Sequence, residues 1–120
     1  SIWEAAMLAA SQQVHNLTAI VDYNKWQATG RSQEVMALEP LADKWIAFRW
    51  HAQEIDGHDL AAISKSLNAA RAETSKPSVI VAHTIKGKGV SFMEDNNNWH
   101  YRTPNSQELA AALVELEEKH

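Results

Sequence analysis

The chain has 120 residues and no cysteine. This absence excludes disulfide bridges, thiolate zinc sites, iron–sulfur clusters and cysteine nucleophiles, and it agrees with a reducing compartment. No apolar run approaches the roughly 18 residues that a membrane span needs, and no basic and apolar leader stands at the start. We therefore expect a cytoplasmic protein with no membrane partner.

Positive charge is also scarce, because 11 Lys and Arg residues stand against 15 Asp and Glu residues and give a formal net charge of −4. Nucleic-acid binding needs a clustered basic surface, which this balance does not indicate, so we expect no nucleic-acid partner. Hydrophobic residues make up 45% and charged residues 22% of the chain. That composition predicts one folded globular domain rather than a disordered segment.

Several common catalytic motifs are missing as well. The chain has no Gly-x-x-x-x-Gly-Lys-Ser/Thr phosphate loop, no Gly-x-Gly-x-x-Gly motif, no His-Glu-x-x-His motif and no Gly-x-Ser-x-Gly elbow. Its six histidines are scattered rather than paired at metal-ligand spacing. The sequence therefore gives no indication of a P-loop nucleotide-binding, metalloprotease or serine hydrolase function.

The first residues, from Ser1 to Gln13, follow a helical pattern with small and apolar side chains around most of the circumference. Such a helix is expected to be buried on several sides, which is more cover than a lone domain of this size supplies. The chain also opens on serine rather than methionine, directly inside that pattern. We therefore expect residues 1–120 to be a portion of a longer protein.

Strand patterns follow at three places. Mostly apolar, β-branched runs at 17–23 and 78–84 predict strands that are buried on both faces. Residues 50–55 alternate between apolar and polar side chains, which also predicts a strand. Polar residues without a period follow the first run at 24–33, and they predict a loop.

Helical spacing separates these strands. It predicts one helix after Pro40, one from the N-cap Asp59 to about residue 72, and one after the cap Ser106. The resulting alternation of helices and strands predicts an α/β fold with a parallel sheet flanked by helices. In such folds ligands bind beyond the carboxyl ends of the strands, where loops open here at Asn24, Asp56 and Lys86.

Two of these loops carry residues with a possible chemistry. Asp22 and Asn24 are hard oxygen donors of the kind that Mg²⁺ takes. The turn Lys86-Gly-Lys-Gly89 offers positive charge and backbone N–H groups to a phosphate, because glycine lets an anion approach the backbone closely. The alternative is that this turn only connects the strand to the next segment. The spacing of its residues alone favours this second interpretation.

Five ordered blocks run from one end of the chain to the other: Ser1-Ile-Trp-Glu-Ala-Ala, Ile20-Val-Asp-Tyr-Asn24, Glu54-Ile-Asp-Gly-His-Asp59, Ala82-His-Thr-Ile-Lys-Gly-Lys-Gly-Val-Ser-Phe-Met-Glu94 and Trp99-His100. Together they resemble the transketolase family, in particular the separately encoded N-terminal subunit of split bacterial and archaeal transketolases. The resemblance implies that residues 1–120 are the carboxyl-terminal portion of a single thiamine diphosphate-binding domain. That family fold is a parallel sheet flanked by helices.

The resemblance implies a magnesium site that includes Asn24 and Trp26. In the family, Mg²⁺ is held by the Asp of a Gly-Asp-Gly motif, by a later Asn, and by the backbone carbonyl two residues after that Asn. The last two match Asn24 and Trp26, which leaves the side chain at position 26 free to vary. Mg²⁺, which Ca²⁺ or Mn²⁺ can replace, would bridge and neutralise the diphosphate of the cofactor.

Other family roles fall on residues outside that pair. His100 matches a catalytic, cofactor-contacting histidine, which holds substrate oxygens or helps proton transfer, although Tyr101 follows it where glycine is common. Lys86 and Gly87 belong to a turn that matches a loop lining the cofactor. Glu4 matches a glutamate in a carboxylate network that links two active sites across a dimer interface.

The resemblance also implies an activity: the transfer of a two-carbon ketol unit from a ketose phosphate to an aldose phosphate with thiamine diphosphate. The Gly-Asp-Gly motif and the pyrimidine-binding domain, fused or separate, are not in this sequence. We therefore expect these residues alone to be inactive and the enzyme to be a homodimer or heterotetramer. The alternatives are a deoxyxylulose-phosphate synthase or pyruvate dehydrogenase-like enzyme, against which Ile85–Met93 argues, and a non-catalytic scaffold that has lost the metal aspartate.

Overall fold

A computed structural model describes residues 1–118. Two compact units make up the chain. Unit 1 comprises residues 1–23 and 38–83, and unit 2 comprises residues 24–37 and the chain from residue 84 onward. Along the described residues, no helix is long and apolar enough to cross a membrane.

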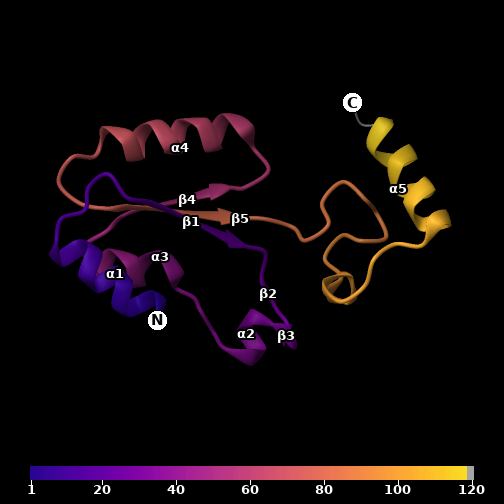
Figure 1. The fold of residues 1–120 in the computed structure, drawn as a ribbon, viewed down its shortest axis with the longest axis horizontal. Helices are drawn as coiled ribbons and strands as arrows, with labels where there is room; N and C mark the ends of the chain where they lie inside the picture. The colour runs from indigo at the N-terminus through magenta and orange to yellow at the C-terminus, as the bar shows by residue number, and fades with distance from the viewer. Residues whose placement is uncertain (119–120) are drawn as a thin grey trace. The chain divides into compact units, whose positions relative to one another are not determined.

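Unit 1 is built on a parallel sheet of three strands in the order β1-β5-β4. The strands are β1 (Thr18–Tyr23), β4 (His51–Asp56) and β5 (Ser78–His83), and Figure 1 shows them running side by side. The register pairs Tyr23 with His83 and Asp56 with His83, so all three strands end at one edge. The predicted parallel sheet flanked by helices is confirmed.

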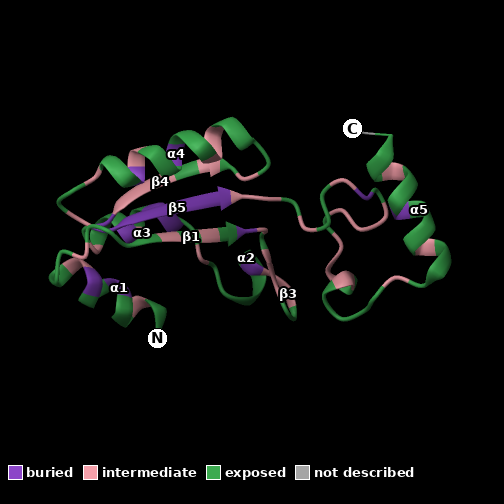
Figure 2. Ribbon diagram, turned by 45° about the horizontal axis from the view of Figure 1, so that its top comes forward, coloured by how far each residue is buried: buried purple, intermediate pink, exposed green. Residues whose placement is uncertain are grey.

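Burial differs between the strands because only the central one has a neighbour on each side. The described residues of β5 are buried except for the last, as predicted, and Figure 2 shows the strand as a continuous buried band. The prediction that β1 is buried on both faces is wrong. It lies at an edge of this sheet, its exposure alternates, and Ile20 is 60% exposed.

Helices cover both faces of the sheet. Helices α1 (Ile2–Ser11) and α3 (Leu41–Ala47) lie on one face and α4 (Leu60–Ala72) on the other (Figure 1). Tryptophan rings fill the core on the first face, with the Trp45 centroid 5.3 Å from Trp3 and 4.8 Å from Trp50. The buried Trp50 indole donates to the Ala6 carbonyl at 2.9 Å, which fixes α1 against this cluster.

Helix α4 begins where the sequence predicts. The Asp59 carboxylate accepts hydrogen bonds from the backbone N–H groups of Ala61 and Ala62, at 2.8 and 3.1 Å, as an N-cap does. Small side chains let the helix approach the sheet, since its buried residues are Ser66 and Ala70. The larger apolar residues Leu60 and Leu67 are 81% and 43% exposed.

Helix α1 buries only one side within unit 1. Ala6 and Ala9 are buried, whereas Ile2, Met7 and Leu8 are exposed. Within the described residues α1 has the sheet and α3 on one side only (Figure 1), so these residues do not supply the cover that we expect on its other sides.

Unit 2 has short elements joined by turns. The predicted loop at 24–33 holds a hairpin of two-residue strands, β2 (Trp26–Gln27) and β3 (Gly30–Arg31), followed by α2 (Ser32–Val35). A 3₁₀ turn, η1 (Asn97–His100), and the helix α5 (Ser106–Glu117) complete it.

The predicted cap of α5 is off by one residue. Asn105 is the N-cap, because its side chain accepts from the backbone of Gln107 and Glu108 while the Glu108 carboxylate accepts from its N–H. This reciprocal arrangement is a capping box, which satisfies more backbone donors than the Ser106 hydroxyl would alone.

Candidate functional site

The hairpin that follows β1 carries the two residues expected at the metal site. The side-chain Oδ1 of the half-buried Asn24 accepts a hydrogen bond from the Trp26 N–H at 2.9 Å. The Ser32 N–H donates to the Lys25 carbonyl at 2.9 Å, and Lys25 has a φ of 67°. The first bond closes an Asx-type turn that fixes the amide of Asn24 beside the backbone of Trp26, and the second joins the two ends of the hairpin.

The Trp26 side chain also has partners within unit 2. Its indole N–H donates to Asp95 at 2.8 Å, and the same carboxylate accepts two hydrogen bonds from Arg31 at 2.6 and 2.5 Å. The Arg31 guanidinium also lies over the Trp26 ring, 3.8 Å from its centroid. The Trp26 side chain thus has contacts of its own, separate from the backbone carbonyl that is expected at the metal.

The charges in this network stabilise one another. Hydrogen bonds from the Arg31 guanidinium, and then from the Trp26 indole, lower the pKa of Asp95 below its ordinary value against the opposing effect of burial. The same pairing with Asp95 raises the pKa of Arg31. Both groups are therefore charged in the folded protein at neutral pH.

The glycine turn after β5 closes on its own chain. Gly87 and Gly89 have positive φ values of 71° and 101°. The Gly89 N–H donates to the Glu94 carboxylate at 2.9 Å, and the Lys88 ammonium lies 3.7 Å from the same oxygen. The Glu94 carboxylate thus occupies the Gly89 N–H and the Lys88 ammonium, two groups that a phosphate would otherwise contact. Lys86 and Gly87 are still the residues that we expect to contribute to cofactor binding.

His100 lies at the end of η1 with its side chain exposed. Its ring meets the Tyr101 ring edge-on, with centroids 4.8 Å apart. The Tyr101 hydroxyl donates to the Ala28 carbonyl, and the Asn97 side chain donates to the carbonyls of Gln27 and Ala28 at 3.1 Å. The turn that bears His100 is therefore tied to the hairpin that bears Asn24 and Trp26.

Glu4, the expected interface residue, belongs to unit 1. It stands in the first turn of α1 and is exposed, with the amine of Ser1 3.9 Å from its carboxylate. The exposed apolar residues Ile2, Met7 and Leu8 share this helix.

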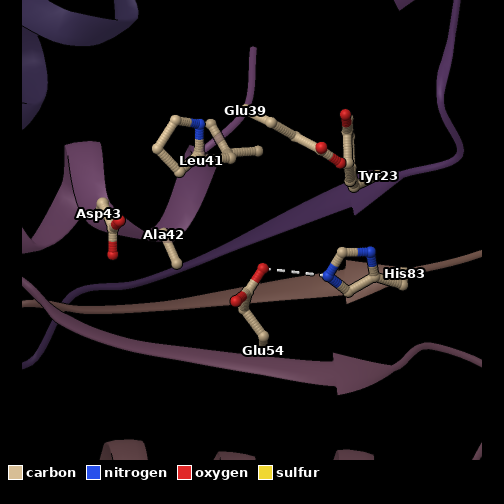
Figure 3. Close-up of a pocket in the computed structure, with 8 residues that line it drawn as sticks. Tyr23, Glu39, Leu41, Ala42, Asp43, Glu54 and His83 are labelled. Atoms are coloured by element: carbon tan, nitrogen blue, oxygen red, sulfur yellow. Dashed lines mark hydrogen bonds and ion pairs between the residues drawn. The ribbon is translucent and has the colours of Figure 1, made fainter. Parts of the chain in front are cut away.

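Unit 1 also holds a pocket that sequence reasoning missed. It occupies about 620 Å³ near the carboxyl ends of the strands, and Tyr23, Glu39, Glu54 and His83 are among its lining residues. His83 Nε2 lies 3.0 Å from the Glu54 carboxylate, and Figure 3 shows the two side chains pointing at each other. The available signal in the sequence was that Tyr23 and His83 each stand at the end of an apolar run, where parallel strands end at one edge.

Tyr23 is a buried titratable residue of this pocket. Its ring meets the His83 ring edge-on at 5.5 Å, and Figure 3 shows Glu39 beside it. Burial, reinforced by a hydrogen bond to the Glu39 carboxylate and its negative charge, raises the pKa of the Tyr23 hydroxyl. Among the described residues, no group of three or more His, Asp or Glu side chains is placed to hold a metal ion.

Comparison with known proteins assigns the arrangement to a family. The family model described as "Transketolase, thiamine diphosphate binding domain" matches residues 2–116. The chain belongs to this family. It is 46% identical over 118 residues to the 6-deoxy-6-sulfo-D-fructose transketolase subunit SqwG of Clostridium sp. (strain MSTE9), covering 98% of this chain and 43% of that protein.

Further members of this transketolase family are also similar. An apulose-4-phosphate transketolase subunit of Phocaeicola vulgatus is 38% identical over 119 residues, covering 99% of this chain and 42% of that protein. The crystal structure of transketolase from Campylobacter jejuni superposes with a TM-score of 0.77 over 98% of this chain and 22% of that one, at 22% identity, which supports the fold alone. The chain thus spans about two fifths of the length of these curated relatives.

Proposed function

We propose that this chain is the carboxyl-terminal portion of the thiamine diphosphate-binding domain of a transketolase. The complete enzyme would move a two-carbon ketol unit from a ketose phosphate to an aldose phosphate in the cytoplasm. The observation that carries this proposal is the turn at Asn24, in which a side-chain amide is fixed 2.9 Å from the backbone of Trp26 within a chain that the family model matches almost throughout.

The donors at this turn suit Mg²⁺. Amide and carbonyl oxygens are hard ligands, and the Asn24 oxygen keeps a second lone pair beyond the one that accepts from Trp26 N–H. We assign the Asn24 side chain and the Trp26 carbonyl to this ion, with the remaining ligands coming from the cofactor and from residues outside this chain. Ca²⁺ or Mn²⁺ would bind the same oxygens.

Thiamine diphosphate, when bound, supplies the electron sink for forming and cleaving the carbon–carbon bond. The residues of this chain then have distinct tasks. The Lys86–Gly87 turn would bind the negatively charged part of the cofactor through charge and backbone N–H groups. A ring nitrogen of the exposed His100 would hold a substrate oxygen and pass a proton to or from it.

The enzyme would need further parts. A pyrimidine-binding domain, fused or separate, would complete the cofactor site, and two copies would form a homodimer or heterotetramer. The exposed apolar side chains of Met7 and Leu8, which lie within a turn of Glu4 on α1, support an interface there, since exposed apolar surface commonly marks one.

The test replaces Asn24 in the full-length protein together with its pyrimidine-binding domain. Calorimetry would measure thiamine diphosphate affinity with and without Mg²⁺, and a coupled assay would measure ketol transfer. Asn24→Ala should weaken Mg²⁺-dependent affinity by about tenfold or more, because it removes a metal ligand. Asn24→Asp should stay near the wild-type affinity, because it keeps an oxygen and the turn.

Asn68→Ala is the matched control, since Asn68 is exposed on α4 in the other unit and lies outside the proposed site. It should leave affinity and transfer unchanged. Wild-type affinity in Asn24→Ala would show that the metal assignment is wrong. A full-length protein that binds no thiamine diphosphate would instead favour the scaffold alternative.

A further inference from the structure

We propose that Asp95 is a positioning residue that holds the hairpin carrying Asn24 and Trp26 in its metal-binding geometry. It does so by fastening the hairpin to the segment that leads to His100. This inference rests on the proposed function, because it assigns to the hairpin the metal site argued above. We refer to the contacts of Asp95 with Trp26 and Arg31 as the carboxylate clasp.

The hairpin needs such support because its strands are very short. β2 and β3 have two residues each, and even longer isolated hairpins are only marginally stable in water. Its backbone geometry therefore depends on contacts from elsewhere in the unit. The Trp26 carbonyl, the assigned ligand, lies on this hairpin, so a shift of the hairpin would displace it.

Asp95 supplies contacts to both strands of the hairpin. Its carboxylate accepts from the Trp26 indole on β2 and, through two bonds, from Arg31 on β3. Bidentate bonds between ions are directional and stronger than bonds between neutral groups. The stacking of Arg31 on Trp26 closes the clasp, since each of the three side chains contacts the other two.

The backbone of Asp95 extends this support to the glycine turn. Its N–H donates to the Lys86 carbonyl at 2.8 Å. Its φ of 53° is left-handed, a conformation that Asp and Asn tolerate better than other side-chain-bearing residues. Asp95 therefore joins the glycine turn to the hairpin.

A second set of hydrogen bonds holds the turn between the two strands of the hairpin. The Asn97 side chain donates to the carbonyls of Gln27 and Ala28, and the Tyr101 hydroxyl donates to that of Ala28. Asn97 is the first residue of η1, which ends at His100, and Tyr101 follows directly after it. The hairpin is thus held at its strands by Asp95 and at its turn by these residues. Without the clasp, the hairpin would populate other geometries, and binding would have to order it first, which lowers the apparent affinity.

Asp95→Asn tests this inference in the full-length protein with its pyrimidine-binding domain. Asparagine keeps the left-handed backbone and an acceptor for Trp26, but it removes the charge paired with Arg31. Calorimetry should show Mg²⁺-dependent thiamine diphosphate affinity weakened by about two- to fivefold, which corresponds to the upper part of the range for exposed ion pairs. Turnover at saturating cofactor should stay near wild type, because the clasp contacts no substrate.

Two further variants test whether the effect comes from the Asp95–Arg31 ion pair. Arg31→Met removes the partner charge. The double variant with Asp95→Asn should weaken thiamine diphosphate affinity no more than either single change, since both single variants and the double variant break the same Asp95–Arg31 ion pair. Glu108→Gln is the matched control. Glu108 also accepts two bonds from an arginine, Arg102, that lies over a tryptophan ring, but this pair does not contact the hairpin.

Hydrogen exchange of residues 25–31, measured without cofactor, separates this inference from the proposed function. Exchange should be faster in Asp95→Asn and unchanged in Glu108→Gln. Unchanged exchange, unchanged affinity, or equal weakening by Glu108→Gln would each overturn the positioning role. If the wild-type protein itself binds no thiamine diphosphate, the proposed function fails, and the positioning role for a metal site fails with it.

Discussion

A single methyl group at Gly87 is expected to disrupt the turn that follows β5. A Cβ built on this glycine would lie 2.6 Å from the Met93 carbonyl oxygen and 2.8 Å from the Met93 carbonyl carbon. Contacts this close to backbone atoms cannot be relieved by rotating a side chain, so Met93 or the turn must move. The φ of 71° also places alanine in a left-handed conformation that it disfavours.

The two effects give the magnitude. A left-handed conformation of a residue other than glycine costs about 1 kcal/mol or more, and overpacking costs about 1–3 kcal/mol. Gly87→Ala should therefore lower the free energy of unfolding by about 2–4 kcal/mol. Because Lys86 accepts from Asp95, the displaced turn should also weaken the hold on the hairpin.

The assay is urea unfolding of the full-length protein, with Gly30→Ala as the control. Gly30 is not in the left-handed region, and its Cβ would meet only the Val35 side chain, at 3.2 Å. That variant should lose about 1 kcal/mol or less, because a side chain can adjust. A loss for Gly87→Ala no larger than for Gly30→Ala would refute the steric argument.

Three other changes probe separate parts of the chain. His100→Ala should lower turnover about a hundredfold while affecting cofactor affinity far less, and unchanged turnover would remove His100 from the mechanism. Asp59→Ala should lower the free energy of unfolding by about 1 kcal/mol through loss of the α4 cap, whereas Lys65→Ala, at an exposed position in the middle of the same helix, should not. Because the folded pKa of Tyr23 is raised, its stabilising contribution is present below the ordinary tyrosine pKa of about 10 and is lost as the pH rises through the folded value. Denaturation followed from pH 9 to about 11.5 should thus show an alkaline loss of stability that is smaller in Tyr23→Phe, and an identical loss in both proteins would contradict this.

Local chemistry was sufficient to predict most elements of unit 1. The N-cap at Asp59, the helix after Pro40 and the apolar run of β5 each depend on a few consecutive residues. Their order then restricts the fold, because parallel strands need helical crossovers. The predicted α/β fold is confirmed for that reason.

Burial and long-range contacts could not be predicted in the same way. The composition of β1 fits a central strand, but its exposure depends on how many neighbours the sheet gives it. The pairing of His83 with Glu54 depends on the register of two strands, which neither sequence segment encodes alone. The expected roles of Asn24, Lys86, Gly87 and His100 came from family resemblance, and they stay predictions.

The sequence by itself determined which segments form helices and strands and which family they resemble, because those properties depend on neighbouring residues and on ordered motifs. Only the tertiary structure decided that the Trp26 side chain is fixed, since its partner Asp95 lies 69 residues away. Hydrogen bonds and ring contacts between such distant residues require the chain to have folded. The carboxylate clasp and the pocket at Tyr23 are therefore properties of the fold.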